Sequence, residues 1–309
     1  MMKKNVFLAV ALLALMATGA FAQTTWTLVQ VADRPAGGTY NYTSIAYGNG
    51  KFVAGDRAGK MATSTDGATW TAVADSAFGS TWIRGIAYGN NRFVAGGDNG
   101  KMATSPDGTT WTAVADSKFG TYGIMAITYN NNRFVAVGYG GRMATSPDGT
   151  TWTLVANSTI SPYYIWGITY GNNRFVAVGD NGKMATSPDG TTWTAVANST
   201  FALTTIWGIA YGNNRFVAVG DNGKMAVSTD GTAWTAVADN TFDTNPILSI
   251  TFGNNMFVAL GADGQTAVST DGTTWTAATR STRNGIFITY ANNMFIVVGS
   301  TNAISYSKN

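Results

Sequence analysis

The chain has 309 residues with no Cys and no His, and all 16 of its acidic residues are Asp. These absences exclude a disulfide framework, a thiol nucleophile, a zinc–cysteine cluster, and the commonest general base and metal ligand. We therefore expect no metal and no cofactor. Charged residues make up only 11% of the chain and Gly contributes 37 residues. This composition is typical of a β-rich, turn-rich protein.

The first 22 residues have the pattern of a secretory signal peptide. Lys3 and Lys4 precede an apolar run over residues 6–16, and Ala20-Phe21-Ala22 forms a small-residue cleavage site. We expect cleavage near Ala22-Gln23, a secreted or periplasmic protein, and one domain over residues 23–309. The apolar run is too short for a membrane span. Without the leader, 17 basic residues face 16 acidic ones, which argues against nucleic-acid binding.

An internal repeat of about 41 residues covers the rest of the chain. An aromatic residue followed by Gly, Asn or Ala and then Asn recurs at positions 47, 88, 129, 170, 211, 252 and 290. A second series recurs at Trp70, Trp111, Trp152, Trp193, Trp234 and Trp275. One unit predicts four strands, over residues 206–211, 215–219, 224–228 and 234–237, joined by Asn- and Gly-rich turns. Four short strands per repeat are typical of a propeller blade.

The repeat count predicts a seven-bladed β-propeller of four-stranded antiparallel blades. The first strand occurs seven times, whereas the internal fourth strand occurs six times. Residues 24–29 match the missing fourth strand, and residues 303–307 match a third strand. We therefore expect the N-terminal strand to close the C-terminal blade, which hides both sheet edges. Trp26 then becomes the seventh equivalent Trp.

The turn before each Trp has its own recurring sequence, for example Ser105-Pro106-Asp107-Gly108-Thr109-Thr110-Trp111. This resembles the Asp-box, or bacterial neuraminidase repeat, with the pattern S-x-D-x-G-x-T-W, although one residue is missing between Asp and Gly. We expect the Asp to accept backbone N–H groups, the Gly to take a positive φ and the Trp to pack between blades. The resemblance implies structural boxes away from any active site. Their key residues are Asp66, Trp70, Asp107, Trp111, Asp148, Trp152, Asp189, Trp193, Asp230, Trp234, Asp271 and Trp275.

A sialidase-like glycoside hydrolase is the enzymatic alternative. Hydrolases of the resembling family use an arginine cluster, an acid/base Asp and a Tyr activated by Glu, but this chain has no Glu. Its Arg residues mostly occupy repeated turn positions, as at 92, 133, 174 and 215. Asp239 and Asp243 form the only acidic pairing outside the repeat pattern that the sequence offers for glycoside hydrolysis. We therefore expect a protein without catalytic residues.

The candidate ligand-binding residues lie where the repeats differ, on the inter-blade linkers and the start of each first strand. Antiparallel order places these linkers and the second-to-third turns on one face. The repeat position that varies most from copy to copy is occupied, from the first copy to the seventh, by Thr43, Arg84, Met125, Trp166, Trp207, Leu248 and Ile286. The candidate binding residues are Arg84, Tyr122, Tyr163, Tyr164, Trp166 and Trp207. The alternative interpretation is that these aromatic rings fill space between blades.

Two further repeated features lie on the same face. Sequences such as Asp98-Asn99-Gly100 lack a calcium-loop pattern and predict hairpin turns. Lys60, Lys101, Arg142, Lys183 and Lys224 follow these turns and predict a basic ring, which either meets an anionic polymer or forms a solvated rim.

Near-duplicate blades favour repeated weak binding over a single catalytic site. The leading hypothesis is a multivalent lectin-like protein that binds a glycan or polysaccharide on the linker face. The alternative is a scaffold that binds an envelope or secreted protein and assists assembly.

Overall fold

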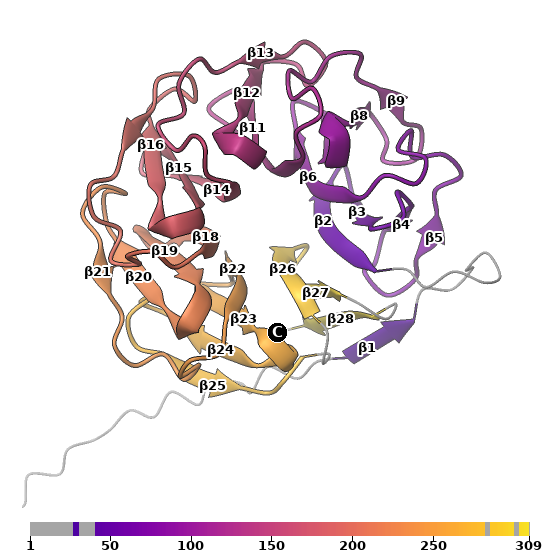
Figure 1. The fold of residues 1–309 in the computed structure, drawn as a ribbon. Helices are drawn as coiled ribbons and strands as arrows, with labels where there is room; N and C mark the ends of the chain where they lie inside the picture. The colour runs from indigo at the N-terminus through magenta and orange to yellow at the C-terminus, as the bar shows by residue number, and fades with distance from the viewer. Residues whose placement is uncertain (1–26, 31–40, 282–284, 300–302, 309) are drawn as a thin grey trace, which may run out of the picture.

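The computed structural model describes residues 27–30, 41–281, 285–299 and 303–308. Seven four-stranded antiparallel sheets are arranged as blades around a central channel (Figure 1), which confirms the predicted propeller.

Six blades are each built from four consecutive strands. The first blade contains β2 (Tyr42–Gly48), β3 (Lys51–Asp56), β4 (Met61–Ser64) and β5 (Thr71–Ala72). The second contains β6 (Ile83–Gly89), β7 (Arg92–Gly97), β8 (Met102–Ser105) and β9 (Thr112–Ala113), and the third contains β10 (Ile124–Asn130), β11 (Arg133–Gly138), β12 (Met143–Ser146) and β13 (Thr153–Leu154). The next three are β14 (Ile165–Gly171), β15 (Arg174–Gly179), β16 (Met184–Ser187), β17 (Thr194–Ala195); β18 (Ile206–Gly212), β19 (Arg215–Gly220), β20 (Met225–Ser228), β21 (Thr235–Ala236); and β22 (Ile247–Gly253), β23 (Met256–Gly261), β24 (Thr266–Ser269), β25 (Thr276–Ala278).

The seventh blade joins both ends of the described chain. It contains β26 (Gly285–Ala291), β27 (Met294–Gly299), β28 (Ala303–Lys308) and β1 (Thr27–Gln30). Strand β1 pairs with β28 in antiparallel register, from Thr27 opposite Tyr306 to Gln30 opposite Ala303 (Figure 1). The predicted closing strand is thus confirmed. The expected signal peptide and Trp26 lie outside the described residues.

The strands and turns follow the expected local chemistry, with small differences at their ends. Asn213 and Asn214 both have positive φ, 44° and 57°, which is the type I′ geometry that matches strand twist. Lys224 is not part of the third strand, because its N–H closes the short 3-10 turn η4 (Asp221–Gly223) on Asp221. The other such turns are η1 (Asp98–Gly100), η2 (Tyr139–Gly141), η3 (Asp180–Gly182) and η5 (Ala262–Gly264).

The box-like turns form the hydrogen bonds that the sequence predicts. Asp107 Oδ1 accepts the N–H groups of Thr109 and Thr110, both at 2.8 Å. Gly108 has a φ of 78°, and Trp111 Nε1 donates to the Gly108 carbonyl at 3.0 Å. The backbone N–H groups hold the pKa of Asp107 well below its usual range, against a smaller effect of burial. The remaining five boxes repeat these contacts, at Asp66, Asp148, Asp189, Asp230 and Asp271.

The hydrophobic core lies between blades, as seven clusters around the ring. In one of them, Val53 and Met61 of the first blade contact Phe93 and Trp111 of the second. Phe78, on the linker between these blades, is fully buried in the same cluster. The equivalent linker residues Phe119, Ile160, Phe201 and Phe242 are also buried. Because a core side chain anchors each of these five linkers, they are fixed segments rather than free loops.

The two faces of the propeller are assigned by hydrogen bonds. Asn90, in a first-to-second turn, donates to Pro147 in the box turn of the next blade. Lys101, after a second-to-third turn, donates through Nζ to the Phe78 carbonyl of a linker at 3.0 Å. This confirms the predicted division into a box-turn face and a linker face. Within the described ranges, no helix is long and apolar enough to cross a membrane.

Candidate functional site at the channel mouth

A β-bulge in every first strand creates the repeat position that varies most from copy to copy in the sequence. In β14, pairing with β15 shifts between Ile165 and Gly167, so Trp166 is left out of the ladder. A bulge re-aims the unpaired side chain, and here it directs one side chain per blade to the mouth of the channel. The same shift occurs in all seven first strands. The seven side chains, with Arg57 and Trp82, line a pocket of about 250 Å³ on the linker face, which we call the mouth pocket.

In three blades the residue 14 positions later in the sequence binds the mouth side chain. Trp166 Nε1 donates to Asp180 Oδ1 and Trp207 Nε1 donates to Asp221 Oδ1, both at 2.6 Å. In the second blade the same two positions hold an ion pair. Arg84 Nε lies 2.5 Å from Asp98 Oδ1, and Arg84 Nη2 lies 3.1 Å from Oδ2. The acidic residues of these hairpin turns therefore orient the side chains of the pocket wall.

Aromatic contacts extend this wall across neighbouring blades. The rings of Trp166 and Trp207 lie 4.8 Å apart, and Tyr139 stacks on Tyr164 at 4.2 Å. Tyr139 also meets the edge of Trp166 at 6.0 Å, and burial raises the pKa of its hydroxyl. Contacts of this kind stabilise a fixed arrangement of rings.

Two arginines lie over Trp82 at the rim of the mouth pocket. The guanidinium carbon of Arg84 is 3.6 Å from the ring centroid, and that of Arg57 is 4.6 Å from it. Trp82 Nε1 donates to the Thr43 hydroxyl at 3.1 Å, which fixes the ring. The two arginines differ in their partners. Arg84 forms an ion pair with Asp98, whereas Arg57 forms none within the described ranges.

The structure brings together four of the six candidate binding residues. Arg84, Trp166 and Trp207 line the mouth pocket, and Tyr164 contacts Trp166 at 5.9 Å. The remaining two lie apart from the pocket. Tyr122 is 45% exposed beside Arg142, and Tyr163 packs on a core cluster.

Sequence reasoning missed Arg57, Trp82 and Tyr139. Arg57 and Tyr139 occupy the same repeat position as Asp98, Asp180 and Asp221, so this position also varies between blades. A blade-by-blade comparison of the residues at this repeat position with those at the bulged position would have identified the supporting pairs.

The basic side chains after the second-to-third turns mainly hold the linkers. Lys224 Nζ donates to the Phe201 carbonyl at 3.0 Å, and Arg142 Nη1 donates to the Lys118 carbonyl at 2.9 Å. Lys183 lies 5.7 Å from the ring of Tyr163. The donors that bind linker carbonyls are therefore part of the framework.

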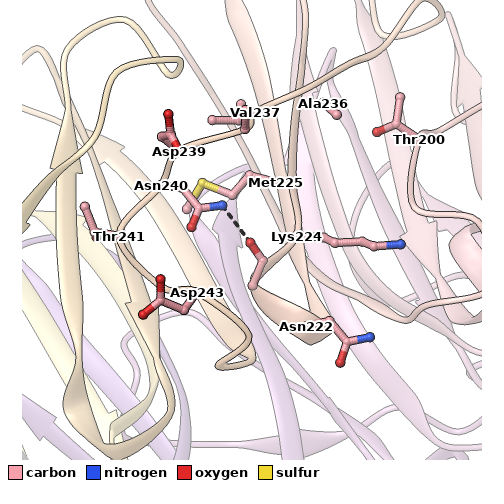
Figure 2. Close-up of a pocket in the computed structure, with 12 residues that line it drawn as sticks. Thr200, Asn222, Lys224, Met225, Ala236, Val237, Asp239, Asn240, Thr241 and Asp243 are labelled. Carbon is pink, nitrogen blue, oxygen red and sulfur yellow. Dashed lines mark hydrogen bonds between the residues drawn. The ribbon is translucent and has the colours of Figure 1, made fainter.

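A second pocket, of about 440 Å³, lies under the linker between the fifth and sixth blades (Figure 2). Asp239 and Asp243, the acidic pair that the sequence singles out, both line it. Asn240 Nδ2 donates to the Gly223 carbonyl at 2.6 Å, where Ser199 of the preceding linker binds the Gly182 carbonyl. Figure 2 shows Lys224 directed away from both carboxylates. Among the described residues, no group of three His, Cys, Asp or Glu side chains is placed to hold a metal ion.

The fold and the site define a seven-bladed β-propeller with one irregular pocket at its channel mouth. The chain belongs to the family described as "DUF6242 beta propeller domain", which matches it over residues 11–133, 115–240 and 209–309. No curated protein matches the chain. The kinship with Asp-box repeats stays a prediction.

Several solved structures share the fold. "YCF48 bound to D1 peptide" is 15% identical with a TM-score of 0.71, and covers 92% of this chain and 95% of that chain. YCF48 from Cyanidioschyzon merolae is 17% identical with a TM-score of 0.70, covering 92% and 98%. A virginiamycin B lyase from Staphylococcus aureus is 12% identical with a TM-score of 0.75, covering 93% and 100%. At these identities the likeness establishes the fold alone.

Proposed function

We propose that this propeller is a non-enzymatic binding protein that holds an apolar peptide segment of a partner protein in the mouth pocket. The observation that carries the proposal is the asymmetry of that pocket. Seven bulged positions contribute seven side chains of six different types, among an otherwise repeated framework. A single shaped pocket suits one extended ligand better than a set of equivalent weak sites.

The chemistry of the pocket wall favours a peptide over a sugar. Met125, Leu248 and Ile286 offer no hydrogen-bond donor and no strong acceptor, and together with the two Trp rings they form an apolar wall. The Trp166 and Trp207 N–H groups already donate to Asp180 and Asp221. A sugar brings many hydroxyl groups, which would lose water without gaining partners here. An apolar side chain loses nothing by entering the same space.

The structural neighbours are compatible with either class of role. One similar propeller is described as bound to a peptide and another as a lyase. We draw from them only that a propeller of this size accommodates peptide binding.

Glycan binding is the second candidate, and the pocket in Figure 2 is the observation that favours it. Asp239, Asp243, Asn222 and Thr200 give that pocket a polar lining suited to hydroxyl groups. Most of its lining comes from linker residues, whereas the mouth pocket is lined mainly by the bulged positions of the first strands. The same carboxylates are the place to look for turnover on a panel of glycosides.

The test of the proposed function is a binding screen on the purified protein against peptide and glycan arrays in parallel. We expect hits on apolar peptides, followed by loss of binding in Trp207→Ala. The matched control is Tyr122→Ala, which removes an exposed ring of the same face outside the pocket. Glycan hits that disappear in Asp243→Asn but persist in Trp207→Ala would move the function to the linker pocket.

We also propose that the protein is exported, on the strength of the leader pattern in residues 1–22. N-terminal sequencing of protein recovered from the medium or periplasm should read from Gln23. Recovery of the uncleaved chain in the cytosol would overturn export and leave peptide binding unaffected.

A further inference from the structure

Resting on the proposed peptide binding, we infer that the mouth pocket selects a segment with opposite charges at its two ends. A carboxylate is received at the first blade and an ammonium or guanidinium group at the fourth and fifth blades, with apolar groups between them. The inference comes from unbalanced charges that lie on opposite sides of the channel.

The positive side is Arg57. Its side chain is exposed on the turn between β3 and β4, and its guanidinium lies over Trp82 at the pocket rim. Within the described ranges, that guanidinium makes no ion pair and no hydrogen bond. The preceding residue, Asp56, is buried, and its Oδ1 accepts the turn's own N–H groups from Ala58 and Lys60. A planar guanidinium with free donors is suited to bind a carboxylate through two hydrogen bonds.

The neighbouring cation, Arg84, is not available to bind a carboxylate of the ligand in the same way. Arg84 is mostly buried, with 13% of its side chain exposed, and both oxygens of Asp98 bind it. The pair contributes little net charge to the rim. The free positive charge of the wall is therefore concentrated on Arg57.

The negative side is formed by Asp180 and Asp221, which are partly exposed. Each uses Oδ1 to accept a Trp N–H, and neither forms an ion pair within the part of the chain that the structure describes. The nearest basic residues in their own turns are committed elsewhere, since Lys224 binds the Phe201 carbonyl and Lys183 lies beside Tyr163. Two carboxylates thus lie within hydrogen-bond distance of the mouth tryptophans, just outside the pocket lining, and neither is paired with a cation in the described ranges.

The two sides lie across the ring from each other. Arg57 belongs to the blade of β2, and the carboxylates belong to the blades of β14 and β18, which stand opposite it around the channel (Figure 1). Met125, Leu248 and Ile286 lie in the wall between them. An apolar wall lowers the local dielectric constant, so it strengthens the attraction of a ligand's charges for both sides.

At the repeat position that Arg57 occupies, the charge of the first blade is opposite in sign to that of three other blades. The position of Arg57 holds an acidic residue in the second, fourth and fifth blades, as Asp98, Asp180 and Asp221. Tyr139 and Ala262 are uncharged at this position, and Asp98 is paired with Arg84, so the unpaired charges of the rim are Arg57 on one side and Asp180 and Asp221 on the other.

The experiment measures affinities of end-capped peptides with a leucine core and four end patterns: Asp with Lys, Asp alone, Lys alone, and no charge. We expect the peptide with both charges to bind about tenfold more tightly than the uncharged one at low salt, with most of this gain lost at 0.5 M NaCl. An uncapped peptide, carrying a terminal carboxylate in place of Asp, distinguishes the two sources of the anionic group.

Arg57→Asp provides the decisive variant. It should lose the preference for the acidic end, and a fifth peptide, with Lys at both ends, should bind to it most tightly. Lys60→Asp makes the same charge change three residues later, outside the mouth pocket, and should leave the preference unchanged. Melting curves of both variants check the fold.

The outcomes separate the two proposals. Equal affinity of charged and uncharged apolar peptides overturns the charge selection while peptide binding stands. Failure of every peptide to bind the folded protein overturns the proposed function, and the charge selection with it.

Discussion

The repeat is nearly constant from blade to blade on the box-turn face of this propeller, and it varies from blade to blade at the channel mouth on the linker face. On the box-turn face, six turns hold the same set of bonds, and in all six the Gly N–H donates to a Ser hydroxyl at 2.8 Å. At the channel mouth, the seven equivalent positions hold Thr, Arg, Met, Trp, Trp, Leu and Ile. Framework residues and variable residues therefore occupy separate positions of one blade. A duplicated blade can keep its fold while a single bulged position changes.

The largest expected effect comes from comparing two Trp residues of the fifth blade. Trp234 is 9% exposed and packs between blades, so Trp234→Ala should cost about 3–5 kcal/mol of unfolding free energy. Trp207 is only partly buried at the mouth, so Trp207→Ala should cost about 1 kcal/mol and abolish peptide binding. Urea unfolding of both variants measures the difference. Equal losses of stability would mean that the mouth is also framework.

A smaller effect separates two glycines on the linker face that share a positive φ. A Cβ on Gly100 would lie 2.2 Å from the Gly120 carbonyl oxygen, whereas a Cβ on Gly120 would meet open space. Gly100→Ala should therefore cost about 3 kcal/mol, combining steric overlap with a strained φ. Gly120→Ala, the matched control, should cost about 1 kcal/mol.

Chemical denaturation of the two glycine variants provides the measurement. If Gly100→Ala were as stable as its control, the linkers would be free to move away from the turns. The linker face would then be flexible, in contrast to the box-turn face.

The smallest effect is a dependence of stability on pH that belongs to the box-turn face. Hydrogen bonds from the Thr69 and Ala68 N–H groups lower the pKa of Asp66 to about 2, from an ordinary value of 3.8. Because the pKa is lower in the folded state, the carboxylate stabilises the fold fully above about pH 4. That contribution is lost as the pH falls through about 2.

Melting temperatures between pH 5 and pH 2 test this dependence. The midpoint should fall steadily, and Asp66→Asn should be less stable at pH 7 but lose less on acidification. A flat profile in the wild type would show that the box carboxylates are unimportant to the fold.

The sequence predicted the framework well because its signals are local and repeated. The aromatic and Trp spacing gave the blade count, and residues 24–29 matched a missing strand whose counterpart, β1, does close the ring. Three of the mouth residues, Arg84, Trp166 and Trp207, were found because they differ between copies. Tertiary contacts decided the rest. Nothing in the local sequence indicates that Arg57 lies over Trp82 of the following linker, or that Tyr139 stacks on Tyr164.

The linkers are more firmly held than the variation in their sequence suggests. Differences in linker sequence suggested binding loops, yet five of the described linkers carry a buried residue such as Phe201, and four of these five also carry a side chain such as Ser199 that binds a turn carbonyl. Tyr163 accordingly packs inward, and Tyr122 lies outside the mouth pocket. Variation between copies marks function only where the side chain also reaches open space.

The pairing of β1 with β28 has a consequence for biosynthesis. The two strands lie at opposite ends of the sequence, so the ring cannot close while the C-terminal residues are still in the ribosome. Six blades contain all their strands in one stretch of chain and can form as they emerge, whereas β1 must wait unpaired until β26, β27 and β28 have been made. Closure is then a late step between distant parts of the chain, and it is slow because a long loop must be ordered to bring them together.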